Sequence, residues 1–216
     1  MSFIVSIEGN IGSGKTTLLE YLKIYFKTKP IVFLREPVDE WENIKDKQGN
    51  TMLQKFYADQ EKYSFSFQMM AYISRLAILK DTIEANPNAI IITERSLMTD
   101  RHVFAKMLFD SGKIEDVNYQ IYQKWFDHFS NYYTIHKIIY VKTSPNICFA
   151  RINQRDRVGE SVIPFDYIEN CSRYHDDMLF NIYDKSLLVL DGNIDINENP
   201  QQLQLWINQI ELFISF

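Results

Sequence analysis

A chain of 216 residues, 46% hydrophobic and 24% charged, can bury the core of one ordinary globular domain. Its formal net charge of −5 leaves no broad cationic surface, so neither a nucleic acid nor a membrane is an expected partner. The two cysteines, Cys148 and Cys171, have no metal-ligand or redox spacing and fit a reducing compartment. Because the first residues enter a predicted strand with no cationic or apolar leader, we expect a cytoplasmic protein.

Short apolar runs alternate with helix-length segments along the whole chain. Strands are predicted at 3–7, 31–34, 89–92, 137–141 and 187–190, and helices at about 15–27, 61–85, 97–111, 116–133, 144–156, 164–181 and 199–214. Strands this short, apolar on both faces and separated by helices, form a parallel sheet that helices cover on both sides. The sequence therefore predicts a single α/β domain over residues 1–216, with a doubly wound five-stranded parallel sheet.

A glycine-rich loop joins the first predicted strand to the first predicted helix. It matches the phosphate-binding pattern G-x-x-x-x-G-K-[ST], the P-loop, in which backbone N–H groups and a helix N-terminus surround phosphates. The lysine of such a loop pairs with the phosphate charge, and the hydroxyl that follows it ligates Mg²⁺. The residues expected to bind ATP are Gly9, Asn10, Ile11, Gly12, Ser13, Gly14, Lys15, Thr16 and Thr17.

Carboxylates and arginines follow the second and third predicted strands. Glu36 lies beside Arg35, and Glu94 lies beside Arg95. Ligands of open α/β sheets bind beyond the carboxyl ends of the strands. One carboxylate there can hold Mg²⁺ while the other accepts a proton from an attacking hydroxyl. For either pair alone, a solvated salt bridge is an equally good interpretation.

Three arginines, Arg151, Arg155 and Arg157, lie close together near the end of a predicted helix. The planar fork of arginine donates several hydrogen bonds at once, which suits the charge of a transferring phosphoryl group. We therefore expect a short arginine-bearing lid over about 151–163, with an exposed basic helix end as the alternative.

Together these motifs resemble the deoxyribonucleoside kinases, most closely the deoxycytidine and deoxyguanosine kinase branch. The resemblance extends from Gly9 to Leu190-Asp191. It implies a P-loop kinase that transfers the γ-phosphoryl group of ATP to the 5′-hydroxyl of a deoxyribonucleoside, with Mg²⁺, in nucleotide salvage. The motifs that carry it, in chain order, are Gly-Asn-Ile-Gly-Ser-Gly-Lys, Glu36-Pro37-Val38-x-x-Trp41, Phe65-Ser66-Phe67-Gln68 with Arg75 downstream, Glu94-Arg95-Ser96-x-x-x-Asp100-Arg101, and Arg151-x-x-x-Arg155-x-Arg157.

The resemblance also implies roles for individual residues. Glu36 matches the catalytic base and Arg95 the arginine that steadies it, while Glu94 matches the metal-site acid that acts with Thr16. Lys15 and the three lid arginines complete the expected catalytic set. Tyr57 and Glu160 resemble the pair that holds the sugar 3′-hydroxyl, Gln68 the reader of the base edge, and Phe104 the ring stacked on the base. The full set expected to bind the nucleoside is Glu36, Trp41, Tyr57, Phe67, Gln68, Arg75, Arg95, Asp100, Phe104 and Glu160.

The preferred nucleoside follows less directly. Arg75 and Asp100 match a charged pair of the deoxycytidine and deoxyguanosine kinases, so deoxycytidine or a purine deoxynucleoside is expected in preference to thymidine. Two features depart from the pattern of the deoxycytidine and deoxyguanosine kinases. Segment 39–62 carries acidic residues, and Arg101-His102 resembles a sequence of larger viral thymidine kinases.

Apolar residues cover more than half the circumference of the predicted helix at 116–133, which is wider than one core-facing stripe requires. With the resemblance, this implies a homodimer that packs through the helices at about 97–111 and 116–133. Full burial inside one subunit is the alternative.

The sequence disfavours two other functions. In a thymidylate-like nucleoside monophosphate kinase, glycines would follow Glu36-Pro37, and a carboxylate at the acceptor would repel a substrate that already bears phosphate. A non-catalytic nucleotide-binding subunit, or a GTPase-like switch, is disfavoured because no Asn-Lys-x-Asp sequence occurs and the predicted catalytic charges are all present.

Overall fold

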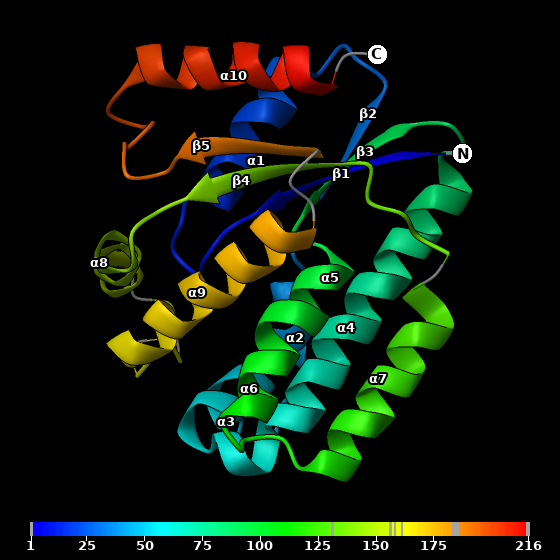
Figure 1. Cartoon of the computed structure of the whole chain (residues 1–216), viewed down its shortest axis with the longest axis vertical. Coiled ribbons are helices and arrows are strands. Elements are labelled where there is room, and N and C mark those ends of the chain that lie inside the picture. Colours follow the sequence, from blue (N-terminus) through cyan, green and yellow to red (C-terminus); the bar gives the residue numbers. More distant parts are fainter. Residues whose placement is uncertain are drawn as a thin grey trace.

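The structure is a computed structural model that describes residues 2–130, 132–155, 157, 159–160, 162–182 and 186–214. Its centre is a sheet in the order β2-β3-β1-β4-β5, in which every pair of neighbours is parallel (Figure 1). This confirms the predicted five-stranded parallel sheet. The strands are β1 (Phe3–Glu8), β2 (Ile31–Leu34), β3 (Ile90–Glu94), β4 (Lys137–Lys142) and β5 (Leu187–Asp191).

Alternate residues of the central strand point to opposite faces of the sheet. On one face, Val5 and Ile7 pack in a buried cluster with α1 (Lys15–Tyr25) and with Trp206 of α10 (Pro200–Ile214). Figure 1 shows these two helices together on one side of the strands. Their burial fixes the start of α1, and with it the P-loop, at the carboxyl end of β1.

The opposite face of the sheet carries the remaining long helices (Figure 1). Ile4 packs there against Tyr72 of α4 (Gln60–Ala85) and Phe126 of α7 (Asp116–Ser130). In a neighbouring cluster, residues of β4 pack against α9 (Phe165–Ile182). Helices therefore cover both faces, as the two-sided apolar strands predict.

The predicted helix at 97–111 is wrong as a continuous α-helix. It is divided into α5 (Leu97–Thr99), a π-helical turn η1 (Asp100–Ala105) and α6 (Lys106–Asp110). The wider turn adds a residue to the helix, and such turns are frequent at functional sites. Asp100 and Phe104, both predicted to bind the nucleoside, lie within it.

Two short helices, α2 (Val38–Asn43) and α3 (Met52–Ala58), occupy a segment for which no element is predicted. The capping box of Thr51 and Gln54 begins α3. The remaining differences are shifts of element boundaries; for example, β3 ends at Glu94 rather than at residue 92, and α1 ends at Tyr25 rather than at residue 27.

The predicted lid is described only in part. Helix α8 (Pro145–Arg155) carries its first half, and residues 156, 158 and 161 of the predicted 151–163 segment lie outside the described residues. No helix in the described ranges is long and apolar enough to cross a bilayer.

Candidate active site

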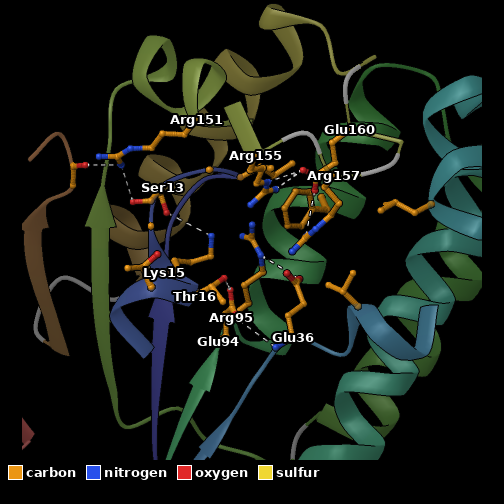
Figure 2. Close-up of a pocket in the computed structure, with 18 of the residues that line it drawn as sticks. Ser13, Lys15, Thr16, Glu36, Glu94, Arg95, Arg151, Arg155, Arg157 and Glu160 are labelled. Carbon is orange, nitrogen blue, oxygen red and sulfur yellow. Dashed lines mark hydrogen bonds and ion pairs between the residues drawn. The ribbon is translucent and has the colours of Figure 1, made fainter. Parts of the chain in front are cut away.

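A cavity of about 360 Å³ opens at the carboxyl ends of β1, β2 and β3 (Figure 2). The strand-end residues of the predicted site converge on it because the strands are parallel and adjacent. Gly9 and Asn10 of the predicted site are not among the residues that line it. The predicted site residues that line the cavity are Ile11, Gly12, Ser13, Gly14, Lys15, Thr16, Thr17, Glu36, Trp41, Tyr57, Phe67, Gln68, Arg75, Glu94, Arg95, Asp100, Phe104, Arg151, Arg155, Arg157 and Glu160.

The P-loop needs glycine at position 12, where its backbone packs against α8. Gly12 has a φ of 76°, and a Cβ added to it would lie 2.6 Å from the Cys148 carbonyl oxygen. Asn10 anchors the loop from behind, since its side-chain Nδ2 donates to the Ile168 carbonyl of α9 over 2.8 Å. The loop backbone is thus held against α8 and α9.

Lys15 lies beneath this loop, with its Nζ donating to the Asn10 carbonyl over 2.7 Å. Its burial, and then the charge of Arg95, lower its pKa from 10.5 to about 7, against the opposing effect of Glu94 and Glu36. A lysine in this state gains charge readily when an anion is bound beside it. The site can therefore supply a full ammonium group to a phosphate.

Glu36 is held between two guanidinium groups. Arg75 Nη2 donates to its Oε1 over 2.9 Å, and Arg95 Nε lies 3.3 Å from the same oxygen. Burial by itself would raise the pKa of Glu36, but the charges of Arg95, Arg75 and Lys15 outweigh it and lower that pKa to about 2. Glu36 is therefore an ionised hydrogen-bond acceptor at any physiological pH.

The Arg95 side chain is itself tightly constrained. Its backbone φ is 64°, a rare value for a residue with a Cβ, and its Nη1 donates to the Gly9 carbonyl over 2.8 Å. The guanidinium lies 4.9 Å above the centre of the Phe104 ring. Its buried Nε–H forms no aligned hydrogen bond with any residue that the structure describes, although Glu36 is close.

Thr16 and Glu94 form the candidate metal site. The Thr16 hydroxyl donates a hydrogen bond to Glu94 Oε1, so the two side chains meet at the floor of the cavity below Lys15 (Figure 2). Mg²⁺ prefers oxygen ligands and is usually bound by one or two carboxylates together with substrate phosphates and water. A hydroxyl and a carboxylate beside a P-loop fit that requirement.

Arg75 and Asp100 form a buried ion pair on another wall of the cavity. Arg75 Nε donates to Asp100 Oδ2 over 2.9 Å, and the two side chains are 8% and 2% exposed. This geometry rules out a surface salt bridge remote from the cavity. Burial raises the pKa of Asp100 to about 6, although Arg75 opposes the rise.

Aromatic side chains and one glutamine complete the same wall. Phe56 stacks on Phe67 with ring centres 4.5 Å apart, and Trp41 meets Phe67 edge to face at 5.7 Å. Gln68 is 2% exposed, and its Oε1 accepts no hydrogen bond from the described part of the chain. A buried amide oxygen without a donor, at the edge of a cavity, indicates a polar ligand with an N–H group or a bound water.

Figure 2 shows Arg155 and Arg157 of the predicted lid beside Glu160, on the opposite side of the cavity from Glu94. Arg155 Nε donates to Glu160 Oε2 over 2.8 Å, and Arg157 Nη1 lies 3.4 Å from Oε1 of the same carboxylate. Burial, and then the charge of Glu160, raise the pKa of Tyr57, so its hydroxyl keeps its proton. Arg151 is held elsewhere, with Nη1 donating to the Gly192 carbonyl over 2.9 Å.

Several lining residues were not predicted. The loop after β5 and Trp206 of α10 complete the cavity near the P-loop, and Tyr167 lines it from α9. The strand-end rule applied to β5 would have found the loop, whereas no local pattern marks Trp206 or Tyr167. The unpredicted lining residues are Val38, Leu53, Phe56, Ala71, Gln154, Tyr167, Gly192, Ile194, Asp195, Ile196, Asn197 and Trp206.

A parallel α/β sheet, a P-loop, paired carboxylates and surrounding arginines define the class of P-loop phosphotransferases. Residues 5–215 match the deoxynucleoside kinase family, and the chain belongs to that family. This confirms the predicted ATP-dependent phosphorylation of a deoxynucleoside.

Individual relatives are similar over almost the whole chain. Deoxycytidine kinase 2 of Gallus gallus and deoxycytidine kinase of Homo sapiens are each 30% identical over 240 residues, which covers 98% of this chain and 90% of the relative. Mitochondrial thymidine kinase 2 of Homo sapiens is 31% identical over 178 residues, which covers 82% of this chain and 64% of that protein.

Proposed function

We propose that this member of the deoxynucleoside kinase family phosphorylates the 5′-hydroxyl of deoxycytidine or a purine deoxynucleoside in preference to thymidine. The observation that carries the proposal is the buried Arg75–Asp100 pair, which lines the same cavity as the P-loop and is joined to Glu36 through Arg75. Hydrogen bonds from Arg75 thus connect Asp100, on the wall that would face the nucleobase, with Glu36, the proposed proton acceptor.

In this proposal, Glu36 receives the nucleoside 5′-hydroxyl. Its ionised carboxylate accepts the hydroxyl hydrogen bond and takes the proton as the oxygen attacks the γ-phosphorus, while the bond to the β-phosphate oxygen breaks. A carboxylate with a pKa near 2 is a weak base, so the proton is transferred late, when the attacking oxygen has become acidic. Orientation of the hydroxyl is then the larger part of its effect.

Arg95 and Lys15 stabilise the charge that develops on the phosphoryl group. The buried Arg95 Nε–H has no aligned acceptor among the described residues, and in this proposal it donates to a substrate oxygen near Glu36. Lys15 would pair with the ATP phosphates from beneath the loop, and the lid arginines, Arg155 and Arg157, would approach from the other side.

Thr16 and Glu94 would hold Mg²⁺ in this proposal. The ion supplies charge neutralisation for the β- and γ-phosphates when it is bound. Glu94 also accepts from the Glu36 backbone N–H over 3.4 Å, which links the metal-binding carboxylate to the proposed base.

On the cavity wall formed by Arg75, Asp100 and Gln68, these three side chains offer donors and acceptors to the exocyclic groups of a nucleobase, and the Gln68 oxygen has no donor among the residues described. The methyl group of thymine can neither donate nor accept a hydrogen bond, and it requires room beside the charged pair of Arg75 and Asp100. A buried polar pair that the wrong base leaves imperfectly satisfied costs about 1–3 kcal/mol, or roughly tenfold to a hundredfold in specificity.

We also propose a homodimer and a cytoplasmic location. Ile121, Trp125 and Phe129 of α7 are about two-fifths exposed although Phe126 of the same helix is buried, so α7 has a second apolar face that a partner subunit would cover. Both cysteines are free and buried, as a reducing compartment allows.

The test is transfer of radiolabel from γ-labelled ATP to the four deoxynucleosides, with deoxynucleoside monophosphates and no acceptor as controls. We expect monophosphate products, with the highest kcat/KM for deoxycytidine or a purine deoxynucleoside. The double substitution Arg75→Met with Asp100→Ala should shift the ratio toward thymidine by tenfold or more. Thymidine as the best substrate of the unmodified protein would contradict the proposed base preference.

A further inference from the structure

One buried side chain contacts Arg95 and has no place in the reaction described above. His175 of α9 is 0% exposed, and its Nε2 lies 3.3 Å from Arg95 Nη1. The two residues are 80 positions apart in the sequence and meet only through the packing of α9 on the sheet. A fully buried histidine in contact with a fully buried guanidinium requires an explanation.

The hydrogen bonds of His175 determine which ring nitrogen carries the proton. Nδ1 lies 2.7 Å from the Cys171 carbonyl oxygen, which can only accept, so Nδ1 carries the hydrogen. Arg95 Nη1 can only donate, so the facing Nε2 must present its lone pair. Both neighbours therefore select the same neutral tautomer, and an imidazolium would place an N–H against the guanidinium.

The charge state agrees with this geometry. Burial, and then the charge of Arg95, lower the pKa of His175 well below its usual value. An uncharged acceptor at this position satisfies a guanidinium N–H without neutralising the cation. A carboxylate at the position of His175 would instead compete with Glu36 for Arg95.

We propose that His175 is a positioning residue for Arg95: its imidazole Nε2 accepts a hydrogen bond from Nη1 and orients the guanidinium toward Glu36 and the P-loop. Three neighbours hold Nη1 and the face of the guanidinium, namely His175, the Gly9 carbonyl and the Phe104 ring. Phe104 also meets the His175 ring edge to face at 6.0 Å. The Nε edge of the guanidinium is thereby directed at Glu36, 3.3 Å away.

The same helix supports the phosphate loop. Ile168, two turns before His175 on α9, accepts the side-chain hydrogen bond of Asn10 over 2.8 Å. The buried face of α9 thus contacts both the P-loop, through Asn10, and Arg95. Any displacement of this face would move the two together.

The inference rests on the proposed function, because it assigns His175 an effect only through the action of Arg95. Two amide substitutions separate the two ring nitrogens. In His175→Asn the side-chain nitrogen replaces Nδ1 and keeps the bond to the Cys171 carbonyl, but nothing reaches Arg95. In His175→Gln the longer side chain replaces Nε2 with an oxygen that can accept from Arg95.

We expect His175→Asn to lower kcat about tenfold to a hundredfold, with KM for ATP and for the nucleoside within about threefold, since orientation of a transition-state contact is lost. His175→Gln should recover most of that kcat. Asp177→Asn, on the exposed side of α9, is the control and should leave kcat unchanged. Equal losses of kcat in the Asn and Gln variants would overturn the inference, because a purely structural histidine does not distinguish them.

A double-mutant cycle with Arg95→Lys tests whether the effect passes through Arg95. We expect His175→Asn to change kcat less than twofold when Arg95 is already lysine. An undiminished effect in that background would refute the positioning role. If Arg95→Lys itself retains full kcat, the proposed function of Arg95 is wrong; if it loses kcat while His175→Asn does not, only the present inference is wrong. Should His175→Asn fail to fold, the comparison of His175→Gln with His175→Leu replaces it.

Discussion

Replacing Glu36 by glutamine removes the proposed base while keeping the shape of the side chain. The amide can still contact Arg75 and Arg95 through its oxygen, so the nucleoside should bind within a few fold of its normal affinity. It cannot take a proton from the 5′-hydroxyl, and loss of such a group typically lowers the rate about 10²–10⁴-fold.

The same substitution also changes the stability of the folded protein. The fall in the pKa of Glu36 from 4.5 to about 2 corresponds to roughly 3 kcal/mol in favour of the ionised, folded form. Because the folded-state pKa is depressed, this contribution is fully present above about pH 4.5 and is lost as the pH falls toward 2. Glutamine resembles the protonated carboxyl, so the variant should be less stable at pH 7 and approach the unmodified protein as the pH is lowered.

Both effects can be measured on one pair of proteins. Steady-state radiolabel transfer gives kcat and KM, and denaturant unfolding between pH 7 and the lowest pH at which the chain stays folded gives the stability difference. Glu40→Gln is the matched control, because that carboxylate lies on α2 close by in sequence and is exposed. Near-normal turnover would remove Glu36 from the base role, and a stability difference that does not shrink with pH would refute the electrostatic reasoning.

Three further predictions follow from the P-loop and α7. ATP binding should raise the pKa of Lys15 from about 7, so at pH 8 calorimetry in two buffers should detect uptake of on the order of one proton; buffer-independent heats would contradict this. Gly12→Ala should weaken ATP binding and lower Tm more than Gly49→Ala, because both have positive φ but only the first would place a Cβ 2.6 Å from the Cys148 carbonyl; equal effects would show that strain alone matters. Trp125→Asp should convert a dimer into monomers, and a light-scattering mass near 25.6 kDa for the unmodified chain would contradict the dimer itself.

The features that could be predicted from the sequence are those encoded in short contiguous stretches. Short continuous apolar runs predict the strands, and the spacing from Gly9 to Thr16 predicts the P-loop, because each depends on residues a few positions apart. Parallel pairing then brings Glu36 and Glu94 to the same edge of the sheet. The cavity wall at Gln68 and Arg75 was predicted through family resemblance, since a glutamine or an arginine on a helix has no functional signature alone.

The remaining features depend on contacts between distant segments. The π-helical turn that contains Asp100 and Phe104 was missed because no local sequence pattern distinguishes it from an α-helix, and its contacts are with α4 and α9, which lie elsewhere in the sequence. The short helices α2 and α3 were missed because they are too short to have a strong periodic signal.

The placement of His175 shows most clearly where prediction from local sequence ends. A lone histidine within a helix predicts nothing, and its effect on Arg95 exists only because α9 packs on the sheet and brings together residues 80 positions apart. Local sequence is enough to predict the strands, the P-loop and the types of charged group at the strand ends. Which of those charges meet, and how deeply each is buried, depends on the packing of distant segments. The pKa of each group follows from that packing, because desolvation and Coulomb energies depend on distances in space.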